Sequence, residues 1–400
     1  MPNSAGPAEP FRQTLINTER NINASAEITG RSVTLDCPTD WSVRTIALRG
    51  GKQEGVDLVV IDNGRLRISL IPTRGMGIFE VVMGDVRLGW DSPVREIVHP
   101  SFVTLQSRGG LGWLEGFNEF IVRCGMESCG APGVDTFINN NGDEATMELT
   151  LHGKVANLPA QELEVIVERQ PPHRIRVRGR VDERTMFGPK LELWTELSTE
   201  IGSNAFRICD VITNRGAGEQ EFQMLYHCNV GRPLLQAGST FLAPVERVTP
   251  INETAAKSVG RYAQFSGPQA GFVEQVYCMR PLAGEDGRTL TMLCNAHRDR
   301  GMSLSFRPSE LPYLTLWKNT AAEADGYVTG IEPATGFPQN RALERKAGRV
   351  PRLAAGASRS MALDFAVLAS ADEVRRCADA IARVQSQRAP VVDEKPAKPL

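Results

Sequence analysis

The chain of 400 residues lacks several features that would place it in a membrane, at a membrane surface or on nucleic acid. No apolar run approaches the roughly 18 residues that a membrane-spanning helix needs. The segment MPNSAGPAEPFRQTLINTER has no apolar core of the kind found in signal peptides. The formal net charge is only -2, which gives no electrostatic reason to expect nucleic acid or an anionic membrane as partner. We therefore expect a soluble, cytoplasmic protein, and the sequence leaves its oligomeric state open.

Paired cysteines and helical patterns are also scarce. None of the eight cysteines forms a C-x2-C pair, so zinc knuckles and a disulfide framework are disfavoured. The clearest helix is predicted at residues 371–387, where Ser370 and Glu373 form a capping-box pattern. The segment APVVDEKPAKPL, residues 389–400, is rich in proline and charge and is predicted to be disordered.

What the sequence has instead is a long series of short, alternating runs separated by Gly, Pro and Asn. VDLVVIDNG and RLRISLI flank an Asp-Asn-Gly turn, and ELEVIVERQPPHRIRVRGRV resembles a hairpin around two prolines. LELWTELSTEIG, FRICDVITNRG and EFQMLYHCNVG continue the series. This pattern predicts an all-β protein: a large, twisted, antiparallel β-sandwich with few short helices.

The domain organisation follows from the same pattern. The strand-like runs show no break or low-complexity linker in the middle of the chain. We therefore predict one β-sandwich domain over residues 1–388. Its first 40 or so residues are expected to form an extension packed on the sandwich, and residues 389–400 the tail.

Polar residues at strand ends beside glycines are the candidates for chemistry, because such positions often face pockets. LHGKV places His152 before a glycine, and LYHCNVGRP places His227 and Asn229 in a similar context. GIEPATGF holds Glu332, and IPTRGMG holds Arg74. Two histidines, a glutamate and an arginine suffice for acid–base chemistry on a polyhydroxylated substrate.

The order of these motifs resembles the aldose 1-epimerase (galactose mutarotase) superfamily. LHG, then YHxN, then a Gly-x-Glu-Pro loop and a closing strand, AAGASRSMALDF, follow one another as in that superfamily. PTRGMGI and the glycine-rich GGLGWLEGFNEFIVRCGMESCGAP are similar to a divergent, poorly characterised branch. The resemblance covers about residues 55–370 and implies the same large β-sandwich.

The resemblance also implies a mechanism and roles for single residues. Its mutarotases open the sugar ring with a glutamate as general base and a histidine as general acid, and need no metal or organic cofactor. By position, Glu332 resembles the base and His227 the acid. His152 resembles the histidine that binds a sugar oxygen, and Arg74 the substrate-binding arginine. We expect His227 and Glu332 to face each other across a space wide enough for a pyranose ring, with Arg74 reaching the same cleft.

The substrate is less closely defined. No counterpart of the superfamily's substrate-binding aspartate is evident, and Cys228 stands where the better-known mutarotases have aromatic character. YLTLWKN offers Trp317 as a platform for stacking a sugar and Lys318 as a partner for a hydroxyl or carboxylate, while Asn229 is a further candidate for substrate binding. The expected partner is a small carbohydrate, either a neutral sugar or an acidic or modified one.

Three functions remain open on the sequence. The first is an aldose 1-epimerase-like isomerase of carbohydrate metabolism that interconverts sugar anomers by acid–base catalysis. The second is a metal-dependent sugar isomerase or lyase, in which His152, His227 and Glu332 would hold a divalent metal. The third is a carbohydrate-binding protein without catalysis.

Overall fold

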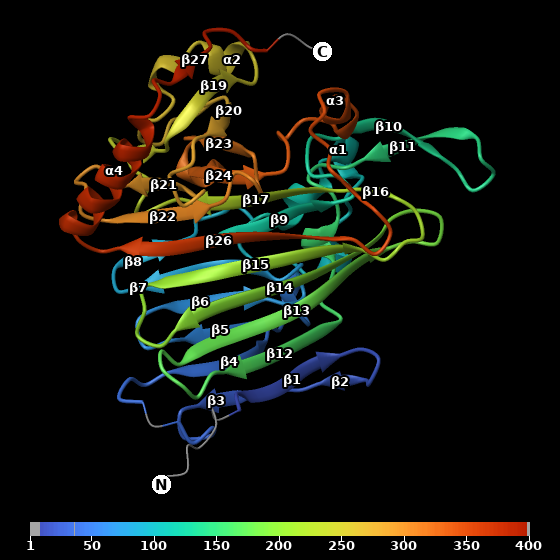
Figure 1. Ribbon diagram of the computed structural model, residues 1–400, viewed down its shortest axis with the longest axis vertical. Helices are drawn as coiled ribbons and strands as arrows, with labels where there is room; N and C mark the ends of the chain where they lie inside the picture. Colours follow the sequence, from blue (N-terminus) through green and yellow to red (C-terminus); the bar gives the residue numbers. More distant parts are fainter. Residues whose placement is uncertain (1–8, 36, 398–400) are drawn as a thin grey trace.

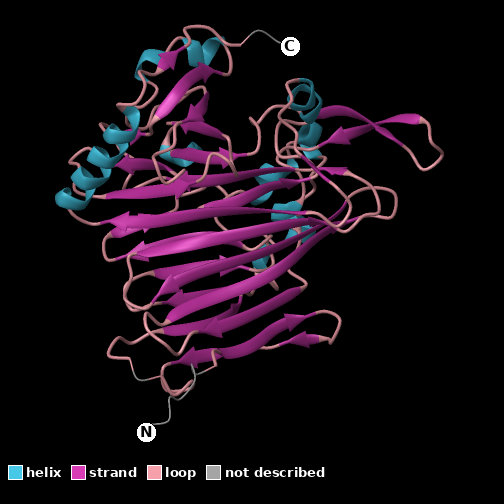
Figure 2. Ribbon diagram, in the orientation of Figure 1, coloured by secondary structure: helices cyan, strands magenta, loops and turns pink. Residues whose placement is uncertain are grey.

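The computed structural model describes residues 9–35 and 37–397, and two large β-sheets packed face to face dominate it (Figures 1 and 2). Strands account for 43% of the chain and helices for 13%. The all-β sandwich predicted from the alternating runs is therefore confirmed. The predicted hairpins are present: VDLVVID pairs with RLRISLI, and ELEVIV pairs with RIRVRGR.

The first sheet has ten strands. In spatial order they are β18 (Thr240–Leu242), β21 (Thr289–Cys294), β22 (Gly301–Phe306), β26 (Ser358–Leu368), β15 (Ala205–Asn214), β14 (Lys190–Glu200), β13 (Arg174–Arg184), β12 (Glu162–Val167), β1 (Phe11–Asn17) and β2 (Ile22–Asn23). All of these neighbours pair antiparallel, so the sheet needs only turns and short loops between most strands.

The second sheet has thirteen strands and carries the candidate site. In spatial order they are β27 (Val391–Val392), β19 (Val245–Pro250), β20 (Gln275–Pro281), β23 (Tyr313–Asn319), β24 (Val328–Ala334), β17 (Gln223–Val230), β9 (Ile121–Met126), β7 (Gly77–Met83), β6 (Arg67–Ile71), β5 (Asp57–Asp62), β4 (Ser42–Ala47) and β3 (Glu27–Thr29), with β8 (Val86–Leu88) paired to β7.

Smaller elements lie around these sheets. Two further strand pairs are β10 (Gly133–Ile138) with β11 (Glu144–Leu149), and β16 (Gln220–Glu221) with β25 (Arg352–Leu353). The α-helices are α1 (Ser107–Gly110), α2 (Glu253–Ala256), α3 (Arg341–Lys346) and α4 (Ala371–Gln385). The 3-10 helices are η1 (Gly51–Gln53), η2 (Pro100–Phe102), η3 (Gly112–Gly116), η4 (Val155–Asn157), η5 (Val259–Arg261) and η6 (Glu323–Asp325).

The helix predicted at residues 371–387 is α4, which runs along one edge of the sandwich (Figure 1). The Ser370 side chain caps the helix by accepting from the Glu373 N–H, and Glu373 Oε2 reaches back to the Ala369 N–H, one residue before the N-cap. Val374 and Ile381 pack against the first sheet in a small apolar cluster. The helix therefore covers a sheet edge, as the sequence indicated.

Within the described residues, both terminal segments contain strands that the sequence did not indicate. The N-terminal segment, predicted as a packed extension, supplies β1 and β2 to the first sheet and β3 to the second. In the segment predicted to be a disordered tail, β27 pairs parallel with β19, and Asp393 accepts hydrogen bonds from Arg247 and Thr249. Strands of two or three residues and single ion pairs leave little periodicity, so sequence patterns do not show them.

One apolar core lies between the sheets, and its residues extend along the chain from Leu15 to Val367. A buried polar network also crosses this space. Arg123 of β9 binds Asp210 of the opposite sheet at 2.5 and 3.0 Å, and Tyr226 of β17 donates to the same carboxylate at 2.8 Å. The network fixes which face of β9 and β17 points inward. The division of the chain into domains stays a prediction.

Candidate active site

Strand β17 is buried on both of its faces, and this double burial creates the candidate site. Met224, Tyr226 and Cys228 point into the core between the sheets. Because side chains alternate along a strand, Leu225, His227 and Asn229 point to the opposite face. That face is covered by a second apolar cluster, which includes Leu225 and the loop residues Trp90, Trp113 and Phe117. His227 therefore lies under a loop, outside the main core.

Asn229 fixes the tautomer of His227. The Asn229 amide nitrogen donates to the carbonyl oxygens of Glu119 and His227, at 3.0 and 3.1 Å. Its oxygen must then face the histidine ring, and it lies 2.5 Å from His227 Nδ1. An amide oxygen can only accept, so Nδ1 carries the proton in the bond. The other ring nitrogen, Nε2, is left free to exchange a proton.

Glu332 lies directly across the strand pair from His227. Leu225 pairs with Ala334 and Cys228 with Ile331, and this register sets His227 opposite Glu332. His227 Nε2 and Glu332 Oε1 are 3.2 Å apart, with both side chains almost fully buried. Glu332 Oε1 nevertheless has no well-directed hydrogen-bond partner among the described residues. Each of the two groups keeps hydrogen-bonding capacity for a ligand.

Burial sets the protonation of the pair. Desolvation holds the pKa of His227 well below its ordinary 6.5, and the neighbouring His152 lowers it further. Desolvation also holds the pKa of Glu332 well above its ordinary 4.5, and the carboxylate of Glu274 adds to the effect. Both shifts favour the uncharged form of each group, so when the pair holds one exchangeable proton, burial favours its placement on the carboxyl group.

Because Gly330 has no side chain, it leaves room for His227 and Glu332. It is the cross-strand neighbour of Asn229 on one side and of Trp317 on the other. A Cβ atom at Gly330 would lie 2.6 Å from Glu332 Oε1 and 3.0 Å from His227 Cε1. A glycine inside a strand often marks such a close approach of another group. The Gly-x-Glu-Pro motif thus supplies both the carboxyl group of Glu332 and, at Gly330, the space beside it.

His152 lies beside His227, as the order of motifs predicted. The two imidazole rings are 5.3 Å apart between centroids, in an edge-on arrangement. His152 Nδ1 donates to the Cys129 carbonyl oxygen at 2.8 Å, which leaves Nε2 as an acceptor. Desolvation lowers the pKa of His152 to about 4, so the ring is neutral around pH 7. Two histidines thus present unprotonated Nε2 atoms.

Aromatic rings surround the two histidines, and only one of them was among the predicted site residues. Trp317 of β23 lies 5.3 Å from the ring of His227, and Phe117 lies 5.2 Å from it. Trp113 lies 4.6 Å from the ring of His152 and 6.0 Å from that of His227. The indole N–H of Trp113 is buried and has no partner among the described residues. Trp113 is therefore a candidate donor that sequence reasoning did not select.

Glu274 is a second residue that the sequence gave no signal for. Its Oε2 accepts the indole N–H of Trp317 at 2.8 Å, which fixes the plane of that ring. Glu274 directly precedes β20, where no motif marks it. Only its contact with Trp317 and its electrostatic effect on Glu332 connect it with the site.

Arg74 has a different position from the one predicted. Its side chain is fully buried and forms an ion pair with Glu119, with Nε 2.7 Å from Oε1. The guanidinium group also donates to Val98 O, Asn157 Oδ1 and Gly116 O. Four of its five N–H groups are thus bonded to the protein. Arg74 holds the loop that carries Trp113 and Phe117, and it does not reach an open cleft.

Lys318 also lies away from the histidines. It follows Trp317 in β23, so it points to the opposite face of the strand, toward the side of Leu314 and Leu316 in the main core. Its ammonium group donates to three carbonyl oxygens in the segment 261–264, at 2.6 to 3.4 Å. Desolvation lowers the pKa of Lys318 to about 8. This lysine binds a loop, whereas Trp317 faces the site.

The space expected between acid and base is closed in this structure. His227 and Glu332 are in direct contact, whereas a pyranose ring between them had been predicted. Only 5% of His227, 1% of Glu332 and 8% of His152 is exposed. The pairing of β17 with β24 sets the two side chains directly opposite each other. Within residues 9–35 and 37–397, no cluster of three or more His, Cys, Asp and Glu side chains has the arrangement of a metal site.

Comparison with known proteins identifies the family to which the chain belongs. Residues 53–367 match the model of the family described as "Domain of unknown function (DUF4432)". None of the curated proteins searched is similar to the chain. Among solved structures, a "putative aldose 1-epimerase" from Klebsiella pneumoniae is 39% identical, with a TM-score of 0.91, over 97% of this chain and all of the other.

More distant structures share the fold. A galactose mutarotase-like protein from Clostridium acetobutylicum is 12% identical, with a TM-score of 0.53, over 80% of this chain and 97% of its own. A "putative aldose 1-epimerase" from Escherichia coli K12 is also 12% identical, with a TM-score of 0.51, over 78% and 99%. Among the described residues, no helix is long and apolar enough to cross a membrane. The chain belongs to the DUF4432 family, a branch of the aldose 1-epimerase (galactose mutarotase) superfamily.

Proposed function

We propose that the protein is an aldose 1-epimerase-like enzyme that interconverts the anomers of a sugar by acid–base catalysis at His227 and Glu332. The observation that carries the proposal is the contact between His227 Nε2 and Glu332 Oε1, 3.2 Å apart on adjacent strands. At this distance the two groups are close enough to share one proton. Ring opening of a hemiacetal requires this arrangement, because one oxygen loses a proton while another gains one.

The proton balance of the reaction suits such a pair. One member removes the proton from the anomeric hydroxyl, and the other protonates the ring oxygen, so the bond between C1 and the ring oxygen breaks. Rotation about the C1–C2 bond exposes the other face of the carbonyl, and the reverse transfers close the ring as the other anomer. The pair ends with one proton, as it began, and no redox step occurs.

The protonation state that burial favours bears on which group acts first. With the proton on Glu332 and His227 neutral, the imidazole is the base and the carboxyl group the acid. The superfamily's assignment, with glutamate as base, requires the proton on His227. Transfer across the 3.2 Å contact interconverts the two states, so the pair acts in both directions as one unit.

The remaining residues have supporting roles in this proposal. His152 Nε2 accepts a hydrogen bond from a sugar hydroxyl, and Trp113 Nε1–H donates one, because these are the free polar atoms beside the pair. Trp317 provides a ring face for the sugar, with Glu274 holding its indole. Asn229 and Arg74 position the histidine and the loop. Lys318 has no substrate role in the proposal.

The test is direct measurement of anomer exchange. Freshly dissolved α-anomers of neutral aldoses and of uronic acids are followed by polarimetry and by exchange NMR, with and without the purified protein. We expect acceleration for at least one sugar class, abolished by His227→Asn. Wild-type protein that binds a sugar of the panel without accelerating its exchange would instead support a carbohydrate-binding protein.

A further inference from the structure

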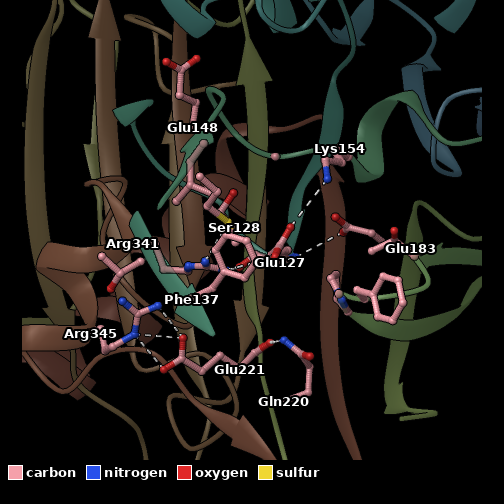
Figure 3. A pocket seen from close by; sticks show the side chains of 18 of the residues that line it. Glu127, Ser128, Phe137, Glu148, Lys154, Glu183, Gln220, Glu221, Arg341 and Arg345 are labelled. Atoms are coloured by element: carbon pink, nitrogen blue, oxygen red, sulfur yellow. Dashed lines mark hydrogen bonds and ion pairs between the residues drawn. The ribbon is translucent and has the colours of Figure 1, made fainter. Parts of the chain in front are cut away.

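A large cavity lies on the other side of the segments that hold His152. Its volume is about 870 Å³, and it is bordered by the β10–β11 hairpin, the turn between β13 and β14, and helix α3 (Figure 3). The hairpin projects from the sandwich on the side opposite α4 (Figure 1). The size lies within the range of ligand sites in proteins, roughly 300–1,000 Å³. The cavity exceeds what a single monosaccharide needs.

Most of the cationic groups that line the cavity are neutralised by acidic neighbours. Arg345 binds both Asp135 and Glu221, at 2.7 to 3.0 Å, and Arg341 binds Asp135 at 2.5 Å. Arg352 lies 3.1 Å from Glu219. Paired guanidinium groups have little remaining attraction for phosphate, so the electrostatics do not favour an anionic ligand.

One carboxyl group at the cavity wall has unused hydrogen-bonding capacity. Glu183 is 5% exposed, and its Oε2 accepts the backbone N–H groups of Met126 and Glu127, at 2.8 and 3.2 Å. Its Oε1 is buried and has no partner among the described residues. A buried polar atom without a partner is destabilising unless water or a ligand satisfies it. Lys154 Nζ lies nearby, 3.6 Å from Glu127 Oε2.

Apolar side chains on the rim complement these polar groups. Phe187, in the turn between β13 and β14, is 64% exposed, and Ile138 of the hairpin is 66% exposed. Phe137 lines the cavity next to Ser128 and Glu127 (Figure 3). Large apolar side chains exposed together at a hollow are typical of binding grooves. A ligand here meets ring faces and hydrogen-bonding groups, and the excess of acidic over basic side chains along the lining disfavours an anion.

We propose that this cavity is a second carbohydrate-binding site, which takes a neutral oligosaccharide and is distinct from the site of His227 and Glu332. Such a ligand combines apolar C–H faces, which suit Phe137 and Phe187, with hydroxyl groups, which suit Glu183 and Lys154. Binding in this cavity does not depend on the proposed epimerase activity.

The cavity wall also connects the two sites. Ser128, Thr150 and Gly153 line the cavity, and they flank the residues that fix His152. His152 donates from Nδ1 to Cys129 O and from its backbone N–H to Gly130 O. A ligand that shifts the segment 127–130 therefore shifts the acceptors of His152. Filling the cavity is expected to change the environment of that imidazole.

The test uses the full chain and a panel of neutral di- to tetrasaccharides with glucose, galactose and mannose units. Binding is measured by titration calorimetry in wild type, His227→Asn and Phe187→Ser, with Phe102→Ser as the matched control. Phe102 is 49% exposed and does not line the cavity. We expect His227→Asn and Phe102→Ser to bind like wild type. Phe187→Ser is expected to bind at least about tenfold more weakly.

Other outcomes overturn the proposal. If no oligosaccharide of the panel binds, or if binding is lost in His227→Asn and kept in Phe187→Ser, the cavity is not a saccharide site. Anomer exchange by Phe187→Ser is measured in parallel. Normal exchange with lost oligosaccharide binding supports two separate sites, and exchange lost together with binding contradicts them. A shift of the His152 ring signals in NMR on oligosaccharide binding tests the connection between the sites.

Discussion

Asn229 Oδ1 lies 2.5 Å from Nδ1 of His227, two residues away on the same face of β17. This bond decides which nitrogen of the ring is left for proton exchange. We predict that Asn229→Ala lowers the rate of anomer exchange about 10- to 100-fold, the range found when a residue that orients a histidine is lost. Nitrogen NMR of the imidazole should show a mixture of tautomers in the variant. An unchanged single tautomer would show that Asn229 does not control the ring.

Loss of either member of the proton-sharing pair should stop the reaction to a similar degree. His227→Asn and Glu332→Gln are each expected to lower exchange by at least about 10²-fold, because each removes a positioned proton-transfer group. The double variant should be no slower than the slower single variant, since the two groups serve one cycle. Rates from exchange NMR check this. Strictly additive losses would mean that the two side chains act independently.

The pH dependence follows from the pKa shifts of the pair. A lowered pKa of His227 means that the second proton binds only well below pH 6.5, and a raised pKa of Glu332 means that the last proton leaves well above pH 4.5. On the acid side, the active one-proton form is therefore lost only well below pH 6.5. We predict that the acid limb of the kcat/KM profile lies well below pH 6.5. An acid limb at about 6.5 would instead indicate a histidine with an ordinary pKa.

Arg74 should matter for stability more than for substrate binding. Removing one partner of a buried ion pair leaves the other charge unpaired, at a cost of about 3–5 kcal/mol. We expect Arg74→Met to lower the free energy of unfolding by about this amount in denaturant titrations. Arg232→Met is the control, because its ion pair with Glu323 is about half exposed and should contribute under about 1 kcal/mol. A stable Arg74→Met variant with only a raised KM would restore the predicted substrate contact.

Removal of metal ions separates the proposed function from a metal-dependent isomerase or lyase. We predict that exhaustive treatment with a chelator leaves anomer exchange unchanged. Elemental analysis of the untreated protein provides the second measurement. Stoichiometric zinc, manganese or iron, lost together with activity and with the signals of His152 and His227 perturbed, would favour the metal-dependent alternative.

Much of the fold could be predicted from the sequence, because the elements concerned depend on local patterns. The hairpin around the Asp-Asn-Gly turn and the capped helix α4 are specified by residues within a few positions of one another. β27 was not predicted, since two residues pairing with β19 leave no periodicity to detect. β1 likewise depends on a distant partner, β12, whereas β2 and β3 are short strands that pair with neighbours along the chain.

The candidate site likewise contains residues that local motifs indicated and residues whose positions depend on distant parts of the chain. The positions of His152, His227 and Glu332 followed from their motifs, and the structure brings them together. Strand alternation could have shown that only one of Trp317 and Lys318 faces the site, because adjacent strand residues face opposite sides. The ion pair of Arg74 depends on Glu119, 45 residues away, and no local pattern indicates it. Trp113 lies in an irregular loop, and no local pattern indicates its position either.

His152 has a backbone φ of 59°, in the left-handed region that a histidine adopts at a cost. Asparagine and glycine occupy this region more readily. A selection for thermal stability alone, applied to a library at this position, should therefore enrich residues that lack the imidazole. Stability engineering of this chain would then erode the very group that lies beside His227, so position 152 is one to hold fixed in any such design.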